Sequence, residues 1–214
     1  MQYITSVLHV LGFGRTGKFF AIEHYDIVPD IIVIAKGLAS GFPLSAIAST
    51  SEIMKSTPPG SMGGTYAGNA VACAAASATI DVMKEEKLLD NTNARGKELT
   101  DGLKEIQKNN PEYHIVDVRG YGLMIGVEFD HHKVPYSTAS KYATFFFFCL
   151  ILKYKLTHIS YFRVIQHCVK NGMLLLSTGA FETLRFIPPL NVTKDEIQTG
   201  LNIFKIALKE AFAK

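Results

Sequence analysis

The sequence predicts an α/β protein, because short apolar runs typical of buried strands are followed by longer stretches with a helical period. The apolar runs Ile31–Ala35 and Leu44–Ser49 are each bounded by Gly and Pro, as strands of a buried sheet commonly are. The alanine-rich stretch Asn69–Lys84 is predicted to be a helix, and its small side chains allow close packing against a sheet or another subunit.

A second, amphipathic helix is predicted over Leu88–Lys108. Leu99, Leu103 and Ile106 recur at helical spacing and form one apolar face. The run Asn109-Asn110-Pro111 is expected to end this helix, because Pro cannot continue it.

Beyond this helix the pattern predicts paired strands and two further helices. His114–Arg119 and Leu123–Phe129 are expected to pair around a Gly-Tyr-Gly turn, because every second residue of the later segment is apolar. The remaining predicted elements are a helix over Val164–Lys170, strands over Met173–Ser177 and Thr183–Ile187, and a last helix that begins with a Thr193–Glu196 capping box and faces inward with Ile197, Leu201, Phe204 and Leu208.

The composition limits the classes of function. The 214 residues, 48% of them hydrophobic, are enough for one or two cores. Lys and Arg exceed Asp and Glu by 22 − 19 = 3, too small a bias to indicate nucleic acid. The three cysteines and seven histidines show no metal-ligand spacing, so no metal site is predicted. The odd number of cysteines and the absence of an apparent signal peptide indicate a reducing compartment, the cytoplasm or the mitochondrial matrix.

Lys36 stands directly after the first apolar run, in Ala35-Lys36-Gly37. Burial disfavours the charged form of an amine, and an amine held partly neutral in a dry site can attack an aldehyde to form a Schiff base. The alternative is that the run is an ordinary core strand and that Lys36 emerges at its end as a solvated residue.

A series of motifs in order surrounds this lysine and makes the chain resemble a known family. The motifs are Gly12-Phe13-Gly14-Arg15-Thr16-Gly17, then Ala35-Lys36-Gly37, then Gly41-Phe42-Pro43-Leu44-Ser45-Ala46, and last Gly63-Gly64-Thr65-Tyr66-Ala67-Gly68-Asn69. The series resembles the class III aminotransferases that use pyridoxal 5'-phosphate (PLP), especially the 4-aminobutyrate transaminase branch. The resemblance covers Gly12–Phe129 and Arg163–Lys214. It implies the PLP-dependent transferase fold type I, with a truncated large domain and an α+β small C-terminal domain.

The resemblance implies roles for residues that bind the cofactor. Lys36 would hold PLP covalently and move a proton between substrate and cofactor carbons. Gly64 and Thr65 would bind the cofactor phosphate, Thr65 that of the neighbouring subunit, which implies a homodimer. Backbone amides and a hydroxyl near a helix start suit a phosphate, but the alternative is that Thr65 only caps the following helix.

Arg185 is the candidate for substrate binding. It lies between the apolar residues Leu184 and Phe186, and a guanidinium in such a place should be paired because it cannot easily lose its charge. The resemblance implies that its planar fork binds the carboxylate of the amino acid or keto acid. The alternative is a structural salt bridge inside the small domain.

Two segments depart from the family. The family has Asp-Glu-Val-Gln-Thr before the residue equivalent to Gly12, and its aspartate pairs with the PLP ring nitrogen. Here Val7 takes that place. Val134–Phe162 contains an apolar run too short for a membrane span, which takes about 20 residues, and is an insertion or a translated intron. The expected organisation is an aberrant N-terminus (1–11), a remnant of the large PLP-binding domain (12–87) and a small C-terminal domain (88–214) with an atypical insert at 134–162.

The expected function is therefore PLP-dependent transamination, in which an amino group moves from an ω-amino acid such as 4-aminobutyrate to a 2-oxo acid. The expected partners are these small molecules and a second subunit, with neither nucleic acid nor membrane. Two alternatives stay open. One is a catalytically inactive, truncated or mis-spliced piece that at most associates with a full-length subunit. The other is a PLP enzyme of the same fold that performs racemisation or decarboxylation.

Overall fold

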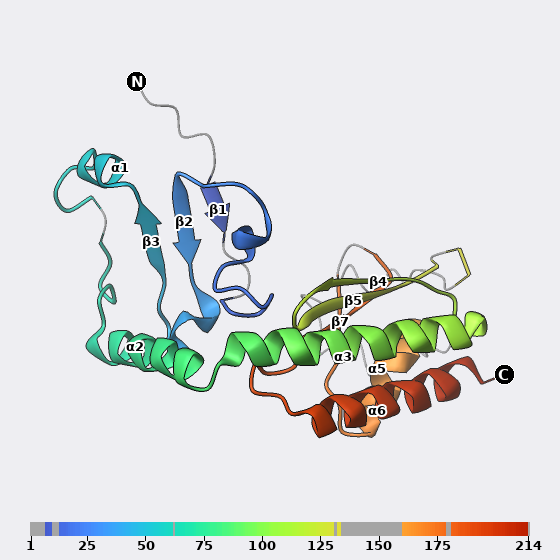
Figure 1. The fold of residues 1–214 in the computed structure, drawn as a ribbon. Helices are drawn as coiled ribbons and strands as arrows, with labels where there is room; N and C mark the ends of the chain where they lie inside the picture. The colour runs from blue at the N-terminus through green and yellow to red at the C-terminus, as the bar shows by residue number, and fades with distance from the viewer. Residues whose placement is uncertain are drawn as a thin grey trace, which may run out of the picture. The chain divides into compact units, whose positions relative to one another are not determined.

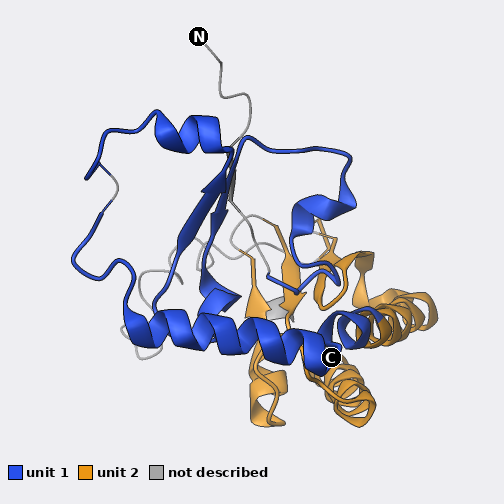
Figure 2. Ribbon diagram, turned by 60° about the vertical axis from the view of Figure 1, so that its left-hand side comes forward, with its two compact units in different colours: residues 1–93 blue, residues 94–214 orange. Residues whose placement is uncertain are grey.

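The computed structural model describes residues 7–9, 13–61, 63–130, 132–133, 160–178 and 181–213 (Figure 1). It divides into two compact units, residues 1–93 and 94–214 (Figure 2). The first unit contains β1 (Val7–His9), η1 (Ala21–His24), β2 (Ile31–Ile34), η2 (Lys36–Ala39), β3 (Ala46–Ser49), α1 (Ser51–Lys55), α2 (Ala70–Glu85) and the start of α3 (Leu88–Asn109).

The sheet of the first unit has the order β1-β2-β3, with β1 parallel and β3 antiparallel to β2. Both predicted strands form, but the expectation that they are buried is wrong. Residues of β2 are half-buried, and most residues of β3 are exposed. A sheet is buried on both faces when helices cover them, whereas α2 packs on η2 and lies across one end of the strands (Figure 1).

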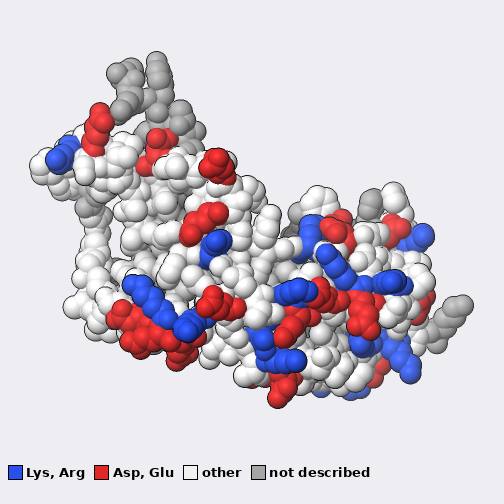
Figure 3. Space-filling view, viewed as in Figure 1, with Lys and Arg blue, Asp and Glu red and all other residues white. Residues whose placement is uncertain are grey.

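One part of the surface of the first unit is poor in charge. Residues 37–51 and 56–80 contain no Asp, Glu, Lys or Arg, and the surface over β3 is largely uncharged (Figure 3). The exposed large apolar side chains in these two stretches are Phe42, Ile47, Tyr66 and Val71. Because these side chains are exposed within stretches that carry no charge, this part of the chain is a candidate interaction site.

The second unit contains the rest of α3, η3 (Pro111–Tyr113), β4 (Ile115–Tyr121), β5 (Met124–Phe129), α5 (Ser160–Lys170), β6 (Leu176–Ser177), β7 (Thr183–Phe186) and α6 (Lys194–Phe212). Its sheet has the order β4-β5-β7-β6 and is antiparallel throughout. The helices α3, α5 and α6 pack on one face of this sheet and enclose a single large core. The other face is free of these helices.

The predicted apolar faces of the second unit are confirmed. Leu99, Leu103 and Ile106 of α3 are buried, and so are the four predicted residues of α6. Alternation along β5 buries Ile125, Val127 and Phe129, and at the centre the rings of Phe186 and Phe204 meet edge to face at 5.0 Å. Helical and strand periods in the sequence therefore identified which side of α3, β5 and α6 faces the core.

The capping box that begins α6 is also confirmed. The Thr193 hydroxyl accepts from the amide of Glu196 at 3.2 Å, and the Thr193 amide donates to the Glu196 carboxylate at 2.8 Å. These donations from the backbone and hydroxyl of Thr193 lower the pKa of Glu196. A carboxyl whose folded pKa is lowered stabilises the fold above its unfolded pKa, near 4.3, and the benefit is lost as the pH falls through the folded pKa.

We therefore expect Thr193→Ala to lower the free energy of unfolding by about 1 kcal/mol at pH 7, because the helix loses its cap. The difference between variant and wild type should shrink below about pH 4, where Glu196 becomes protonated. Urea unfolding, followed by circular dichroism at pH 7 and pH 3, measures this difference in the free energy of unfolding. Thr199→Ala, on an exposed position of the same helix, is the control. Equal stability of the Thr193 variant and wild type at pH 7 would contradict the prediction.

Three sequence expectations concern boundaries and segments. The predicted domain boundary after residue 87 falls in the turn between α2 and α3, while the two compact units divide at 93/94, inside α3. Residues 134–159 of the predicted insert lie outside the described residues. The last three residues of the insert, 160–162, belong to the backbone of α5. Among the helices described here, none is long and apolar enough to cross a membrane.

Candidate functional site

Lys36 begins η2, separated by one residue from the end of β2, and has a left-handed backbone, with φ 57°. A non-glycine residue in this region is strained and persists only where neighbours hold it. Here the turn is anchored by Leu38 and Ala39, which are buried. The side chain of Lys36 is exposed, which corrects the expectation of a dry, buried amine. Within the described part of the chain, its amine makes no ion pair or hydrogen bond.

Thr65 lies in an exposed turn over residues 65–68, four residues before the cap of α2. The cap is Asn69, whose side chain accepts from the amide of Ala72 at 3.0 Å. The alternative that Thr65 caps the helix is therefore wrong. The turn is closed by the Ala67 amide, which donates to the carbonyl of Gly64 at 2.9 Å. Lys36 and Thr65 belong to the same unit, but no hydrogen bond between them is seen.

Arg185 is at the centre of β7, in the second unit, where its cross-strand partners are Gly126 on β5 and Leu176 on β6. Arg185 as a whole is half-buried, and its Nε is buried without a hydrogen-bond partner among the described residues. The structural salt bridge considered as the alternative is not found within those residues. A guanidinium in this state is able to bind a carboxylate with two parallel hydrogen bonds.

Acidic groups near this arginine are bound by another residue. Arg119 on β4 contacts the carboxylate of Asp117 at 2.9 Å and that of Glu128 on β5 at 2.5 Å. Hydrogen bonds to Asp117 and then Glu128 raise the pKa of Arg119. Sequence reasoning did not single out Glu128. The alternation of β5 was the available signal, because it assigns Gly126 and Glu128 to the face opposite the core.

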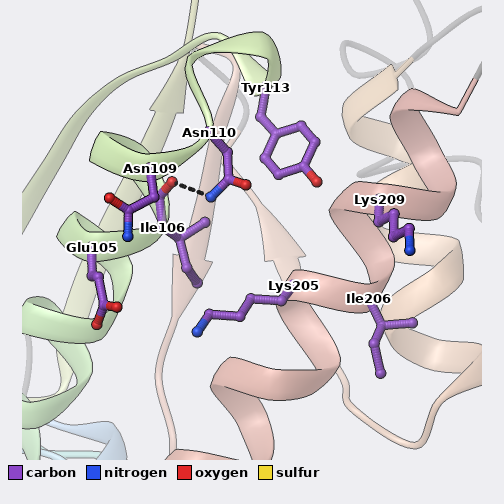
Figure 4. Close-up of a pocket in the computed structure, with 8 residues that line it drawn as sticks. All are labelled: Glu105, Ile106, Asn109, Asn110, Tyr113, Lys205, Ile206 and Lys209. Atoms are coloured by element: carbon purple, nitrogen blue, oxygen red, sulfur yellow. Dashed lines mark hydrogen bonds between the residues drawn. The ribbon is translucent and has the colours of Figure 1, made fainter.

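Other reactive groups do not add to the site. Burial raises the pKa of the Cys168 thiol to about 12, so it is not a nucleophile at neutral pH. Among the residues that the structure describes, no group of three His, Cys, Asp or Glu is placed to hold a metal ion. A pocket of about 350 Å³ lies between the end of α3, Tyr113 and α6 (Figure 4), and none of the predicted site residues lines it.

Comparison with known proteins identifies the family. The profile of the class-III aminotransferases matches residues 10–208. The chain is 39% identical to the 5-aminovalerate aminotransferase DavT of Pseudomonas putida over 204 residues, and 35% identical to the 4-aminobutyrate aminotransferase GabT of Escherichia coli K12 over 205 residues. These alignments cover 95% and 94% of this chain and 42% of each relative. The chain thus spans less than half the length of both.

A solved structure confirms the fold. The ornithine aminotransferase of Toxoplasma gondii, crystallised with oxidised glutathione and partially occupied by PLP at its active site, superimposes with a TM-score of 0.76 at 27% identity. The match covers 96% of this chain and 43% of that one. The expected α/β fold, that of the PLP-dependent transferases of fold type I, is confirmed over this part, and PLP is the cofactor of the family. The chain belongs to the class-III aminotransferases.

Proposed function

We propose that the protein to which this chain belongs is a PLP-dependent transaminase that moves an amino group from an ω-amino acid to a 2-oxo acid. The observation that carries this proposal is the position of Lys36. Its strained backbone at the end of β2 presents an amine that makes no interaction with the described residues. Strain of this kind is commonly found at functional sites, and an unengaged amine is what an aldehyde cofactor requires.

The other proposed roles follow from the chemistry of each residue. The Nζ of Lys36 holds the cofactor and then carries the transferred proton. Gly64 and Thr65 bind the phosphate, and the fork of Arg185 binds the substrate carboxylate. When bound, PLP supplies an electron sink for the substrate carbon. The relatives named for 5-aminovalerate and 4-aminobutyrate support an ω-amino acid as donor.

A homodimer is part of the proposal. Its support is the exposed, uncharged surface of the first unit, on which Thr65 and its turn lie. In this assignment residues 12–87 belong to the large domain of the family and residues 88–214 to the small domain. A location in the cytoplasm or the mitochondrial matrix stays a prediction from the cysteines.

The residues present fit PLP only in part. Lys36 suits its aldehyde, and the Gly64–Thr65 turn suits its phosphate, but β1 offers no carboxylate to the ring nitrogen. The strand is Val7-Leu8-His9, paired in parallel with Ile31–Val33 of β2. A carboxylate there would keep the pyridine nitrogen protonated, and valine cannot. This observation favours a second candidate, a catalytically inactive chain that associates with a full-length subunit.

A transamination assay separates the two candidates. Purified chain, PLP, 4-aminobutyrate and 2-oxoglutarate are incubated, and glutamate is measured against a reaction without amino donor. Because Val7 cannot support the ring nitrogen, we expect no turnover by the chain alone. Robust activity of the chain alone would overturn the inactive candidate and support the proposed transaminase.

A further inference from the structure

The register of the second sheet sets two arginines on either side of one glycine. Arg119 on β4 and Arg185 on β7 are both cross-strand partners of Gly126 on β5. Cross-strand partners project to the same face of a sheet. Neighbouring positions such as Val127 and Leu184 are buried in the core, so this shared face is the one opposite the core helices. Gly126 places no side chain between the two guanidinium groups.

Glu128 lies two residues along β5 on the same face and is within reach of both arginines. Its cross-strand partners are Asp117 on one side and Thr183 on the other. It is therefore diagonal to Arg119 and to Arg185, at about 7–8 Å between α-carbons, a separation that long side chains bridge. The structure shows the Glu128 carboxylate 2.5 Å from the Nη1 of Arg119.

The result is an uneven division of charge across this face. Arg119 binds two carboxylates, while Arg185 makes no ion pair with any described residue and has a buried, unpaired Nε. A buried donor without a partner is unfavourable. If the Glu128 side chain turned from Arg119 to Arg185, its carboxylate would pair with the buried Nε of Arg185 and remove this cost.

We propose that Arg119 is a positioning residue, which holds Glu128 away from Arg185 and so keeps that guanidinium available for a substrate carboxylate. The inference rests on the proposed function, because it takes Arg185 as the carboxylate-binding residue. Without Arg119, a carboxylate ligand has to displace Glu128. The apparent dissociation constant then rises in inverse proportion to the fraction of Arg185 that remains unpaired.

The test uses glutarate as probe, a dicarboxylate with neither an amino nor an oxo group. It is titrated into the ¹⁵N-labelled chain, and the Nε–Hε signal of Arg185 is followed by NMR. Burial of this Nε should slow its exchange with water and keep the signal visible. Loss of the signal in Arg185→Lys assigns it.

We expect Arg119→Gln to shift the Arg185 signal in the absence of glutarate and to weaken glutarate binding about fivefold, the size expected for competition by a partly exposed ion pair. The double variant Arg119→Gln/Glu128→Gln should restore wild-type affinity. Asp117→Asn is the matched control, because β5 separates its strand from β7, and it should bind as the wild type does.

The two proposals fail in different ways. Wild-type affinity in Arg119→Gln, or a double variant as weak as that single variant, overturns the role of Arg119. No response of the Arg185 signal to glutarate in any variant that retains Arg185 overturns the carboxylate site itself. Restored binding in the double variant would show that the loss in Arg119→Gln is not caused by damage to the strands, since the double variant carries the same change at Arg119.

Discussion

Gly96→Ala is expected to lower the free energy of unfolding of the second unit by about 3 kcal/mol, the upper end of the usual cost of overpacking. A Cβ at this position of α3 would lie 2.7 Å from the Cα of Gly122 and nearer still to its carbonyl oxygen. Both groups are backbone, so no side-chain rotation relieves the clash. The turn that contains Gly122 joins β4 to β5, and Leu123 beside it is fully buried. Helix and sheet would have to separate.

Gly200→Ala is the matched control, because Gly200 is also helical. A Cβ there would meet only the Sδ of Met173, at 3.5 Å, an ordinary contact. Alanine favours the helix by about 1 kcal/mol over glycine, so this variant should be more stable than wild type. Urea unfolding followed by circular dichroism compares the three proteins. A stabilised Gly96 variant would show that α3 is not held against the turn as described.

The sequence predicted those features that depend on neighbouring residues. The cap of α6 and the buried face of α3 follow from side chains within one or two turns of each other. Helical spacing and strand alternation are local signals, so the core of the second unit could be predicted without knowing how its elements pair. The site motifs gave the family, but they did not give the surroundings of Lys36 or Arg185.

Features that depend on pairing between distant segments could not be predicted. Nothing local indicates that Arg119 and Arg185, 66 positions apart in number, share Gly126 as a partner (185 − 119 = 66). Register also decides that Glu128 meets Arg119, and β4 carries an irregularity between Ile115 and Asp117 that shifts this register. The burial of β2 was predicted wrongly for a similar reason. An apolar run shows that a strand can be buried, but it does not show which elements cover the strand.

Lys36→Ala is expected to abolish covalent capture of PLP. With equimolar PLP and sodium borohydride, the wild-type chain should gain one phosphopyridoxyl group, and peptide mapping should place it on Lys36. The reason is chemical, because the bond forms only with an unprotonated amine, which alanine lacks. Trapping needs only an amine and an aldehyde, so it reports on Lys36 even in a chain that does not turn over.

A control lysine with the same backbone strain makes this test selective. Lys87, in the turn between α2 and α3, is also exposed and left-handed, with φ 51°, but it does not follow a strand. Lys87→Ala should therefore retain the label in full, and Lys36→Arg should lose it although the positive charge remains. Labelling spread evenly over exposed lysines, or unchanged in Lys36→Ala, would mean that the end of β2 offers no special site for the aldehyde. The transaminase assignment would then lose its catalytic residue, while the fold and family would stand, because they depend on the sequence match and the superposition.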